Sequence, residues 1–301
     1  MAEVGIYLGC FWCGGRNMGL FRKKKRWSWC PEQMEREIPS PQINYNQLQA
    51  KSAKEYLRVF KERACIKELP FLMDSVGLKP SSRLLDYGCG LGRLAYAASK
   101  FLSDDGAYYG FEPNMEALTF LKTAYAERPN FHFHGVELSV EDDYVAVAKG
   151  DRREEGVKAN EIDPTEFVDS AIDVQWSCSV FTHMWTDSII NSLRSFNDMV
   201  SVEGHCVNTW LVVDDFAAYL LRCGRADRTL PFRINGALTS SEDNPLNITA
   251  YELSTVQEIY RDAGHEIVDI LYGSWAGRDN GVIYQDIVIS KVAASLHSKS
   301  H

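Results

Sequence analysis

Residues 84–94 combine an acidic side chain with three alternating glycines, a spacing that suits the binding of a nucleoside. The stretch reads Leu-Leu-Asp-Tyr-Gly-Cys-Gly-Leu-Gly-Arg-Leu, so Asp86 ends an apolar run while Gly88, Gly90 and Gly92 precede another. Glycines spaced in this way remove β-carbons where a bent ligand must lie against the backbone, and they allow turn dihedrals that other residues resist. The pattern predicts a ligand-binding turn between a strand and a helix.

The same spacing argues against a dinucleotide. A dinucleotide-binding turn has its third glycine one position later, where this chain has Arg93, and it needs that glycine to seat a pyrophosphate on the end of the helix. We therefore expect a nucleoside ligand that carries no pyrophosphate.

A second carboxylate ends the next apolar run. Residues 107–112 read Ala-Tyr-Tyr-Gly-Phe-Glu, and Glu112 lies 20 residues after Gly92. A carboxylate at this point can accept both hydrogens of a ribose diol. Alternatively, Glu112 is an acid at the N-terminus of a helix that begins near Pro113. The ribose contact is the interpretation that we favour.

Three later segments extend the pattern. Residues 171–184 place Ser-Val-Phe-Thr-His after an apolar run, residues 199–213 form a further strand after a Glu-Gly turn, and residues 272–289 form a last hairpin. Together with the glycine turn and the second carboxylate, they make the chain from about residue 45 to residue 292 resemble the class I S-adenosylmethionine-dependent methyltransferases. The Ser-Val-Phe-Thr-His segment resembles a subgroup that methylates glycans and other small hydroxyl compounds.

The resemblance implies S-adenosylmethionine as the cofactor and S-adenosylhomocysteine as its product. Asp86 would orient the amino group of the methionyl part, directly or through water, beside the glycine turn. Met115 would cover one face of the adenine, although a residue near the start of a helix often belongs to the core. Glu137 would accept a hydrogen bond from the adenine amino group, although the acids around it favour a surface position equally. The cofactor contacts that we predict are Asp86, Gly88, Cys89, Gly90, Gly92, Glu112, Pro113, Asn114, Met115, Glu137, Leu138, Ser177 and Ser179.

The segment that follows the fourth expected strand indicates a hydroxyl acceptor. In the family, methyltransferases of nucleobases and protein amides carry an Asn-Pro-Pro-Tyr-like signature there, whereas this chain has Ser177-Cys178-Ser179. Methyl transfer to a hydroxyl needs alignment and the removal of one proton, and His183 is the predicted base because imidazole titrates near neutral pH. Alternatively, His183 shapes the pocket through a hydrogen bond to a loop. The transfer of a methyl group to a small amine, or a catalytically silent binding module, remains open.

Two adjacent acids and the last hairpin supply further candidates. Asp214 and Asp215 could be the base or could hold Mg²⁺ with a sugar diol, but adjacent acids at a helix start are more often caps, so we expect no metal. Trp275 and Arg278 are predicted to line the acceptor pocket, because an indole face stacks on the apolar side of a sugar ring. The alternative for Trp275 is a core position.

The elements that must position these residues alternate in type. Helices are expected over residues 47–64 and 66–76, strands over residues 82–86, 107–111, 131–134, 171–177 and 204–213, and further helices near residues 92–102, 114–126 and 186–199. This order predicts an α/β fold: a Rossmann-like, doubly wound, mostly parallel seven-stranded sheet with an antiparallel last strand and N-terminal helices. We divide the chain into an appendage (1–44), a methyltransferase domain (45–292) with an acidic insertion (138–166) and a substrate lid (222–250), and a tail (293–301).

Composition limits the partners. The chain has 301 residues and a formal net charge of −9, and its basic excess is confined to the first 50 residues, so a nucleic acid substrate is disfavoured. Scattered cysteines and the lack of a long apolar run favour a cytoplasmic protein. A basic run with flanking aromatics over residues 21–29 could dock on an anionic membrane, although a solvated tail is the interpretation that we favour. The sequence does not indicate an oligomeric state.

Overall fold

The computed structural model describes residues 61–137, 157–158 and 171–294. Several sequence predictions lie outside these residues. They are the appendage over residues 1–44, the docking run over residues 21–29, most of the acidic insertion over residues 138–166, the cofactor contact of Leu138, and most of the tail.

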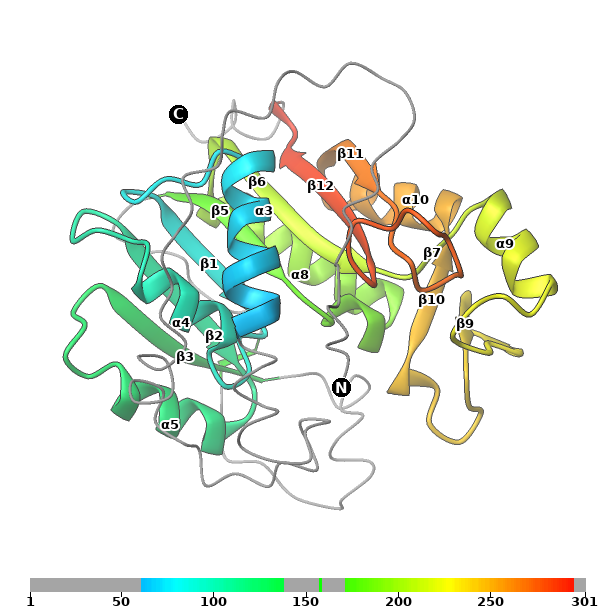
Figure 1. Cartoon of the computed structure of the whole chain (residues 1–301), viewed down its shortest axis with the longest axis horizontal. Helices are drawn as coiled ribbons and strands as arrows, with labels where there is room; N and C mark the ends of the chain where they lie inside the picture. The colour runs from blue at the N-terminus through cyan, green and yellow to red at the C-terminus, as the bar shows by residue number, and fades with distance from the viewer. Residues whose placement is uncertain (1–60, 138–156, 159–170, 295–301) are drawn as a thin grey trace, which may run out of the picture. The chain divides into compact units, whose positions relative to one another are not determined.

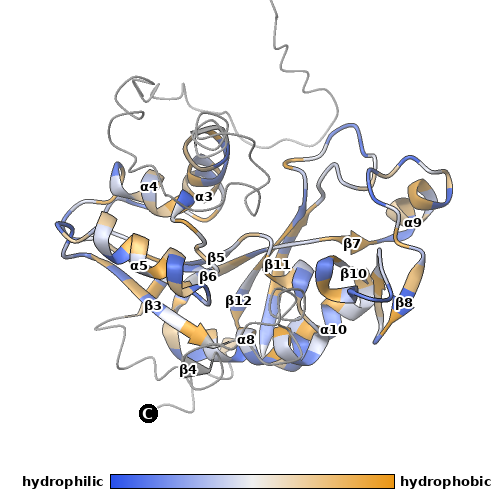
Figure 2. Cartoon of the chain, turned by 90° about the horizontal axis from the view of Figure 1, so that it is seen from below, coloured by the Kyte–Doolittle hydropathy of each residue, from blue (hydrophilic) through white to orange (hydrophobic). Residues whose placement is uncertain are grey.

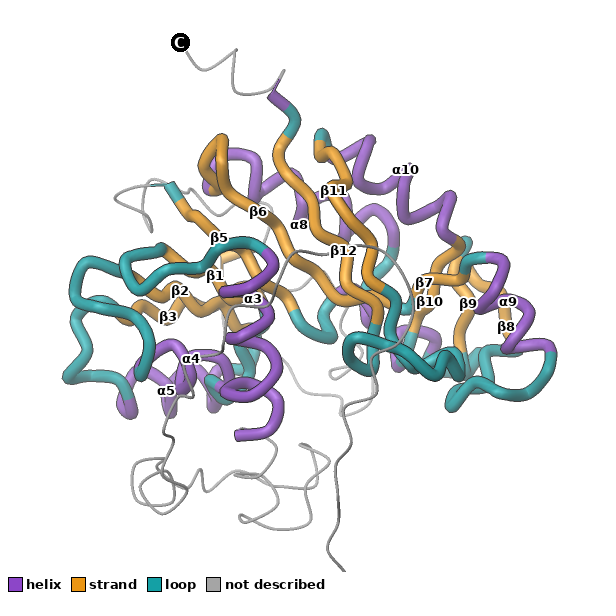
Figure 3. The backbone as a smooth tube through the Cα atoms, turned by 45° about the horizontal axis from the view of Figure 1, so that its top comes forward, coloured by secondary structure: helices purple, strands orange, loops and turns teal. Residues whose placement is uncertain are grey.

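A mostly parallel sheet organises the described chain, with its strands in the order β11-β12-β6-β5-β1-β2-β3-β4 (Figure 3). Only β12 runs antiparallel to its neighbours, β6 and β11. The predicted fold class is therefore confirmed, and the two-residue β4 adds an eighth strand at one edge. The strands are β1 (Arg83–Tyr87), β2 (Ala107–Glu112), β3 (Phe131–Glu137), β4 (Val157–Lys158), β5 (Ile172–Ser177), β6 (Val200–Trp210), β11 (His265–Leu271) and β12 (Asp286–Val292).

Helices cover both faces of this sheet. Figures 1 and 2 show α3, α4 and α5 on one face and α8 and α10 on the other, as a doubly wound fold requires. The π-helix η2 leads directly into α3. The helical elements are η2 (Lys61–Glu68), α3 (Leu69–Ser75), α4 (Arg93–Ser99), α5 (Met115–Ala124), η3 (Phe181–His183), α8 (Thr186–Met199), α9 (Asp215–Arg222), η4 (Pro245–Asn247) and α10 (Leu253–Ala263).

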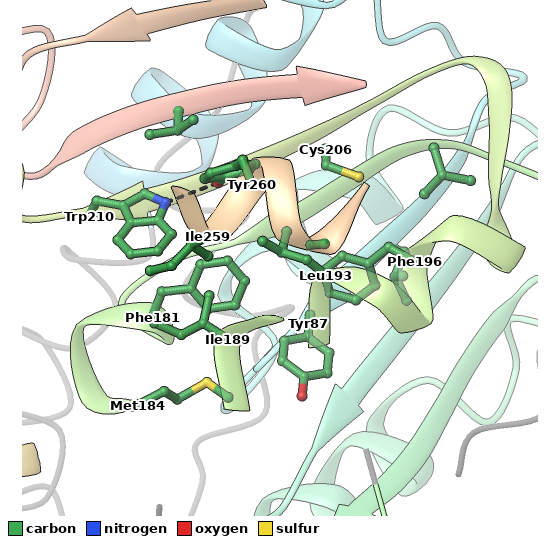
Figure 4. Close-up of a cluster of buried hydrophobic side chains, with 14 of the residues drawn as sticks. Tyr87, Phe181, Met184, Ile189, Leu193, Phe196, Cys206, Trp210, Ile259 and Tyr260 are labelled. Atoms are coloured by element: carbon green, nitrogen blue, oxygen red, sulfur yellow. Dashed lines mark hydrogen bonds between the residues drawn. The ribbon is translucent and has the colours of Figure 1, made fainter. Parts of the chain in front are cut away.

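The buried spacing of α8 explains how it joins the core. Ile189, Leu193 and Phe196 are fully buried and follow one another at intervals of four and three residues, so they lie on one face of the helix. Figure 4 shows these side chains meeting Tyr87 from the end of β1. The rings of Tyr87 and Phe196 pack edge to face with centroids 5.3 Å apart. Aromatic packing against α8 therefore fixes the end of β1.

Two side chains of β6 bind one tyrosine hydroxyl in this core. The indole Nε1 of Trp210 donates a hydrogen bond to the hydroxyl of Tyr260 at 3.0 Å, shown as the dashed line in Figure 4. The amide of Asn208 donates to the same hydroxyl at 3.2 Å. Because a buried donor without a partner is costly, these bonds fix how α10 sits against β6.

A small second sheet adjoins the first. Its strands are ordered β7-β10-β9-β8, with β7 and β10 parallel and the other pairs antiparallel. The predicted lid over residues 222–250 supplies β8, β9 and the start of β10, and its role as a lid stays a prediction. The strands are β7 (Val212–Val213), β8 (Phe232–Ile234), β9 (Ala237–Thr239) and β10 (Thr249–Glu252).

The strand order also locates the functional edge. β1 lies between β2 and β5, so the chain reverses its direction of progress through the sheet at β1. Ligands of open α/β sheets bind beyond the carboxyl ends of the strands at such a reversal. Within residues 61–137 and 171–294, no helix has the length and apolarity that a membrane crossing requires.

Candidate functional site

The predicted ligand turn connects β1 to α4 and needs its glycines. Gly88, Gly90 and Gly92 have φ values of 80°, 56° and 79°, in the left-handed region that favours glycine. A β-carbon on Gly88 would lie 2.5 Å from Val180, and one on Gly92 would lie 2.4 Å from Leu121. A β-carbon on Gly90 would meet no atom within 4 Å. Packing explains the outer two glycines, whereas Gly90 faces open space where a ligand can approach the backbone.

Glu112, at the end of β2, is held between this turn and the next helix. Its Oε2 accepts a hydrogen bond from the backbone N–H of Gly90 at 2.8 Å, and its Oε1 accepts one from Asn114 at 3.0 Å. The side chain is 9% exposed. A carboxylate oxygen can accept more than one hydrogen bond, so these contacts are compatible with the ribose contact, which stays a prediction.

The residues after Glu112 form the start of α5. Pro113 leads into it, and the side chain of Asn114 caps it by accepting from the backbone of Glu116 and Ala117, both at 3.0 Å. The Asn114 side chain is therefore engaged within the protein. Met115 is 46% exposed, and its sulfur would lie 3.7 Å from a β-carbon on Gly135 in β3.

An exposed fraction this large does not fit the alternative that Met115 is a core residue. The contact of Met115 with adenine stays a prediction. Glu137 ends β3, where its backbone pairs with Lys158. Glu137 lies two residues beyond Gly135, which pairs with Glu112, and its adenine contact stays a prediction.

Asp86 is buried beneath the glycine turn. The hydroxyl of Tyr108 donates to its Oδ2 at 2.5 Å. Burial raises the pKa of Asp86 to about 7, with the negative charge of Glu68 adding to the rise and the Tyr108 hydrogen bond opposing it. A cationic amino group nearby would favour the ionised carboxylate, because an opposite charge stabilises the charged form.

A buried ion pair lies next to Asp86 and was not predicted. The guanidinium of Arg93, at the start of α4, binds Glu68 through Nη2 at 2.9 Å and Nε at 3.2 Å. The thiol of Cys178 lies 3.9 Å from the same carboxylate. Glu68 is 5% exposed. Arg93 was noted in the sequence only as the residue that replaces a glycine, and no local pattern pairs it with a helix 25 positions earlier.

Ser179 stands at the carboxyl end of β5 in a strained conformation. Its φ is 58°, uncommon for a residue other than glycine. Its N–H donates to the hydroxyl of Thr209 at 2.8 Å, and its own hydroxyl donates to Oε1 of Gln285 at 2.9 Å. Thr209 donates to the same oxygen at 2.8 Å. The network ties together β5, the end of β6 and the residue before β12.

Ser177 lies differently. Its side chain is fully buried, and its hydroxyl donates to Oδ1 of Asn208 at 2.7 Å inside the sheet. The predicted contact of Ser177 with the cofactor can therefore involve only its backbone. Ser179, by contrast, is exposed.

His183 ends the short helix η3 that follows Ser179. Its Nδ1 lies 3.0 Å from the carbonyl oxygen of Leu246 in η4. Burial lowers the pKa of His183, so the ring is neutral near pH 7. A carbonyl can only accept, so the ring donates from Nδ1 to Leu246, and the backbone of Asn247 makes a further hydrogen bond to the ring. Both partners belong to the predicted lid. The lid therefore orients the ring through the kind of hydrogen bond that the alternative for His183 expects.

Strand β10, which begins inside the predicted lid, holds the loop around His183 at two more points. The hydroxyl of Thr249 donates to the carbonyl of Phe181 at 3.4 Å, and that of Tyr251 donates to the carbonyl of Met184 at 2.7 Å. Both bonds bracket His183. The small sheet is therefore a support for η3.

Asp214 and Asp215 begin α9, as their alternative role predicts. Asp214 is the N-cap and accepts from the backbone of Ala217 at 2.8 Å, and it also forms an ion pair with Arg278. Asp215 is exposed in the first turn. Within the described parts of the chain, no group of three or more His, Cys, Asp or Glu residues could hold a metal ion.

Trp275 requires a correction. Its side chain is 0% exposed, and its Nε1 donates to Asp286 at 2.7 Å, so the indole has no free face for a sugar ring. Asp286 also accepts from the backbone of Val212 at 2.6 Å and of Gly273 at 2.7 Å. Trp275 thus anchors the loop between β11 and β12 to the core, while Arg278 farther along the same loop lines a pocket.

Comparisons with known proteins bear on the fold. No protein-family model matches the chain. The structure is similar to PH0226 from Pyrococcus horikoshii OT3, at 10% identity and a TM-score of 0.51 over 83% of this chain and 96% of that one. It is also similar to the pyocyanin biosynthetic protein PhzM, at 11% identity and a TM-score of 0.50 over 83% of this chain and 61% of that one.

A third neighbour is a TehB-like SAM-dependent methyltransferase from Corynebacterium glutamicum, at 14% identity and a TM-score of 0.46 over 88% of this chain and 100% of that one. At such identities, the similarity to PH0226 and PhzM shows a shared fold. The chemistry must be argued from the site.

Proposed function

We propose that the protein is an S-adenosylmethionine-dependent methyltransferase that acts on a hydroxyl of a small molecule, sugar or glycan. The observation that carries the proposal is the position of Glu112, which binds Gly90 of the glycine turn at the point where the strand order reverses. This arrangement puts a carboxylate suited to a ribose diol beside a turn whose middle glycine faces open space.

The residues present fit this cofactor. Gly88, Gly90 and Gly92 would hold its methionyl part, Asp86 would face the amino group, and Glu112 would bind the ribose. When bound, S-adenosylmethionine supplies a methyl group on a sulfonium sulfur. The catalytic work left to the protein is alignment of the acceptor and removal of its proton.

His183 is the base in this proposal. Its neutral ring is oriented through Nδ1 by Leu246, and a neutral imidazole can take the proton that the acceptor hydroxyl loses during the transfer. Asp214 is less suited to this task because its carboxylate already caps α9 and binds Arg278. We assign no metal to the reaction.

The test is methyl transfer from tritiated S-adenosylmethionine to matched acceptors. Each pair consists of a hydroxyl compound and the corresponding amine, with a sugar pair and an aromatic pair included. We expect label in the hydroxyl compounds. Label only in the amines would replace the proposal with N-methylation, and cofactor binding without transfer to any acceptor would favour a catalytically silent module.

A further inference from the structure

A pocket of about 350 Å³ lies between the start of α9 and the loop that joins β11 to β12. Its walls include two cationic side chains, Arg225 and Arg278, and two aromatic ones, Phe216 and Tyr272. Two arginines in one pocket are notable in a chain whose formal net charge is −9. The pocket belongs to the same loop as Gln285, which binds Ser179 at the carboxyl edge of the main sheet.

Arg278 contacts two aromatic rings in this pocket. Its guanidinium carbon lies 4.4 Å from the ring centroid of Tyr272 and 5.0 Å from that of Phe216. A cation over an aromatic ring is attracted by the ring, so both contacts restrict where the guanidinium lies. The side chain is 14% exposed, so part of it reaches the pocket surface.

Most N–H groups of Arg278 have no hydrogen-bond partner among the described residues. A guanidinium has about five N–H donors, and among the described residues only Asp214 accepts from it, through Nη2. The Nε is buried and has no hydrogen-bond partner. The same Asp214 oxygen also accepts from Ala217 at the N-cap of α9, so its negative charge is shared with the helix. Arg278 therefore keeps N–H groups that bind no described residue.

Arg225 is available at the same pocket. It pairs with Asp279 at 3.5 Å, but the two side chains are 55% and 87% exposed. Pairs this exposed contribute little to the stability of a protein, so a ligand can displace Asp279 from Arg225 at little cost. The backbone of Arg225 is fixed by contact with Gly277, where a β-carbon would lie 2.4 Å from its carbonyl oxygen. This contact holds Arg225 beside the loop that carries Arg278, so both arginines line the same pocket.

The aromatic surface continues beyond the pocket. Phe216 and Tyr219 on α9 are 50% and 53% exposed, and their rings are nearly parallel, with centroids 6.4 Å apart. Exposed rings of this kind offer flat apolar area to a ring-shaped ligand. Such a surface beside two arginines fits an organic acid better than an inorganic anion.

We propose that this pocket binds the carboxylate of a ring-shaped organic acid, with Arg278 and Arg225 as its partners and Phe216 against its apolar body. The assignment of this acid as the methyl acceptor rests on the proposed function, whereas the binding itself does not. Arg228, three residues after Arg225, donates to the hydroxyl of Tyr284 at 3.2 Å, next to Gln285. The segment that supplies the pocket thus reaches the edge where His183 lies.

Calorimetry with four probes tests the proposal. Benzoate and glucuronate carry the carboxylate on an aromatic and a sugar ring, and benzyl alcohol and glucose are their neutral counterparts. We expect at least one acid to bind about tenfold more tightly than its counterpart, because a charged hydrogen bond to a guanidinium is lost in the neutral compound. Tighter binding of benzoate or of glucuronate distinguishes an aromatic acid from a sugar acid. Equal binding of acids and neutral compounds would overturn the proposal.

Variants locate the binding. R278Q should weaken the binding of the acid about tenfold or more. If R278Q does not fold, R225Q should weaken it in the same way. The control is R233Q, since Arg233 is also 55% exposed and paired, with Glu252 at 2.6 Å, but lies on the small sheet outside the pocket. Acid binding that survives both R278Q and R225Q would contradict the proposal. S-adenosylhomocysteine binding, measured on the same samples, reports on the proposed function separately.

Discussion

The carboxylate of Glu112 accepts a hydrogen bond from the backbone N–H of Gly90, 22 positions earlier in the chain. This bond joins the end of β2 to the middle of the turn that follows β1, and it makes the two predicted cofactor contacts one unit. The conformation of Gly90 and the orientation of Glu112 therefore depend on each other.

Replacement of Gly90 separates backbone strain from ligand contact. Gly90→Ala forces a left-handed residue and should lower the free energy of unfolding by about 1–2 kcal/mol. Gly77→Ala is the matched control, because Gly77 has a φ of 70° and a β-carbon there also meets no atom within 4 Å. Both variants should lose similar stability in urea, but only Gly90→Ala should lose cofactor affinity in calorimetry. Equal affinity in the two variants would remove the turn from the site.

The pH dependence of stability tests the burial of Asp86. Burial raises the pKa of Asp86 from 3.8 to about 7 in the folded state. The folded protein then holds a proton that the unfolded chain releases, so this group stabilises fully below pH 3.8, and its contribution is lost as the pH rises through about 7. Asp86→Asn cannot ionise. The free energy of unfolding of this variant, measured in urea, should therefore rise relative to that of the wild type between pH 5 and pH 8. A constant difference between the two would contradict the raised pKa.

The ion pair of Glu68 and Arg93 should behave as a coupled unit. Glu68→Leu leaves Arg93 without its partner and should cost about 2–3 kcal/mol, below the range for a fully buried pair because the Arg93 side chain is 25% exposed. Adding Arg93→Leu should restore part of this loss. Urea denaturation of both single variants and the double variant measures the coupling. Simple additivity would show that the pair contributes nothing.

The role of His183 is tested by rate and pH together. His183→Ala should slow turnover by about 10²–10⁴-fold with little change in cofactor affinity. In the wild type the rate should fall as the pH drops through the imidazole pKa, which burial lowers below its ordinary value of 6.5. His205→Gln is the control, since His205 lies at the middle of β6, away from its carboxyl end. A small loss with the pH profile kept would move the role to Asp214 or Asp215.

The parts of the site that follow from sequence are those encoded by local spacing. The three glycines and Glu112 lie within 25 residues, and their strand-turn-helix context fixes where they meet. Trp275 illustrates the opposite case, because its burial depends on Asp286, 11 residues away across a loop, and on packing that no periodicity signals. Glu68 was missed for the same reason, since its partner lies in another helix.

The predicted lid shows an intermediate case. The sequence predicted a substrate lid over residues 222–250, and the strands of this segment lie outside the main sheet. The pairing of β8, β9 and β10 into a small sheet with β7 depends on long-range contacts, so the sequence did not reveal that Leu246 would orient His183.

The central claim is tested most directly by calorimetry of S-adenosylhomocysteine binding to the wild type and to Glu112→Ala. Removal of the carboxylate should weaken binding by about 1–3 kcal/mol, because the ribose diol loses its acceptor. Glu116→Ala, which removes an acid from the exposed first turn of α5, is the control and should bind like the wild type. Wild-type affinity in Glu112→Ala, or no binding to the wild type at all, would contradict the account.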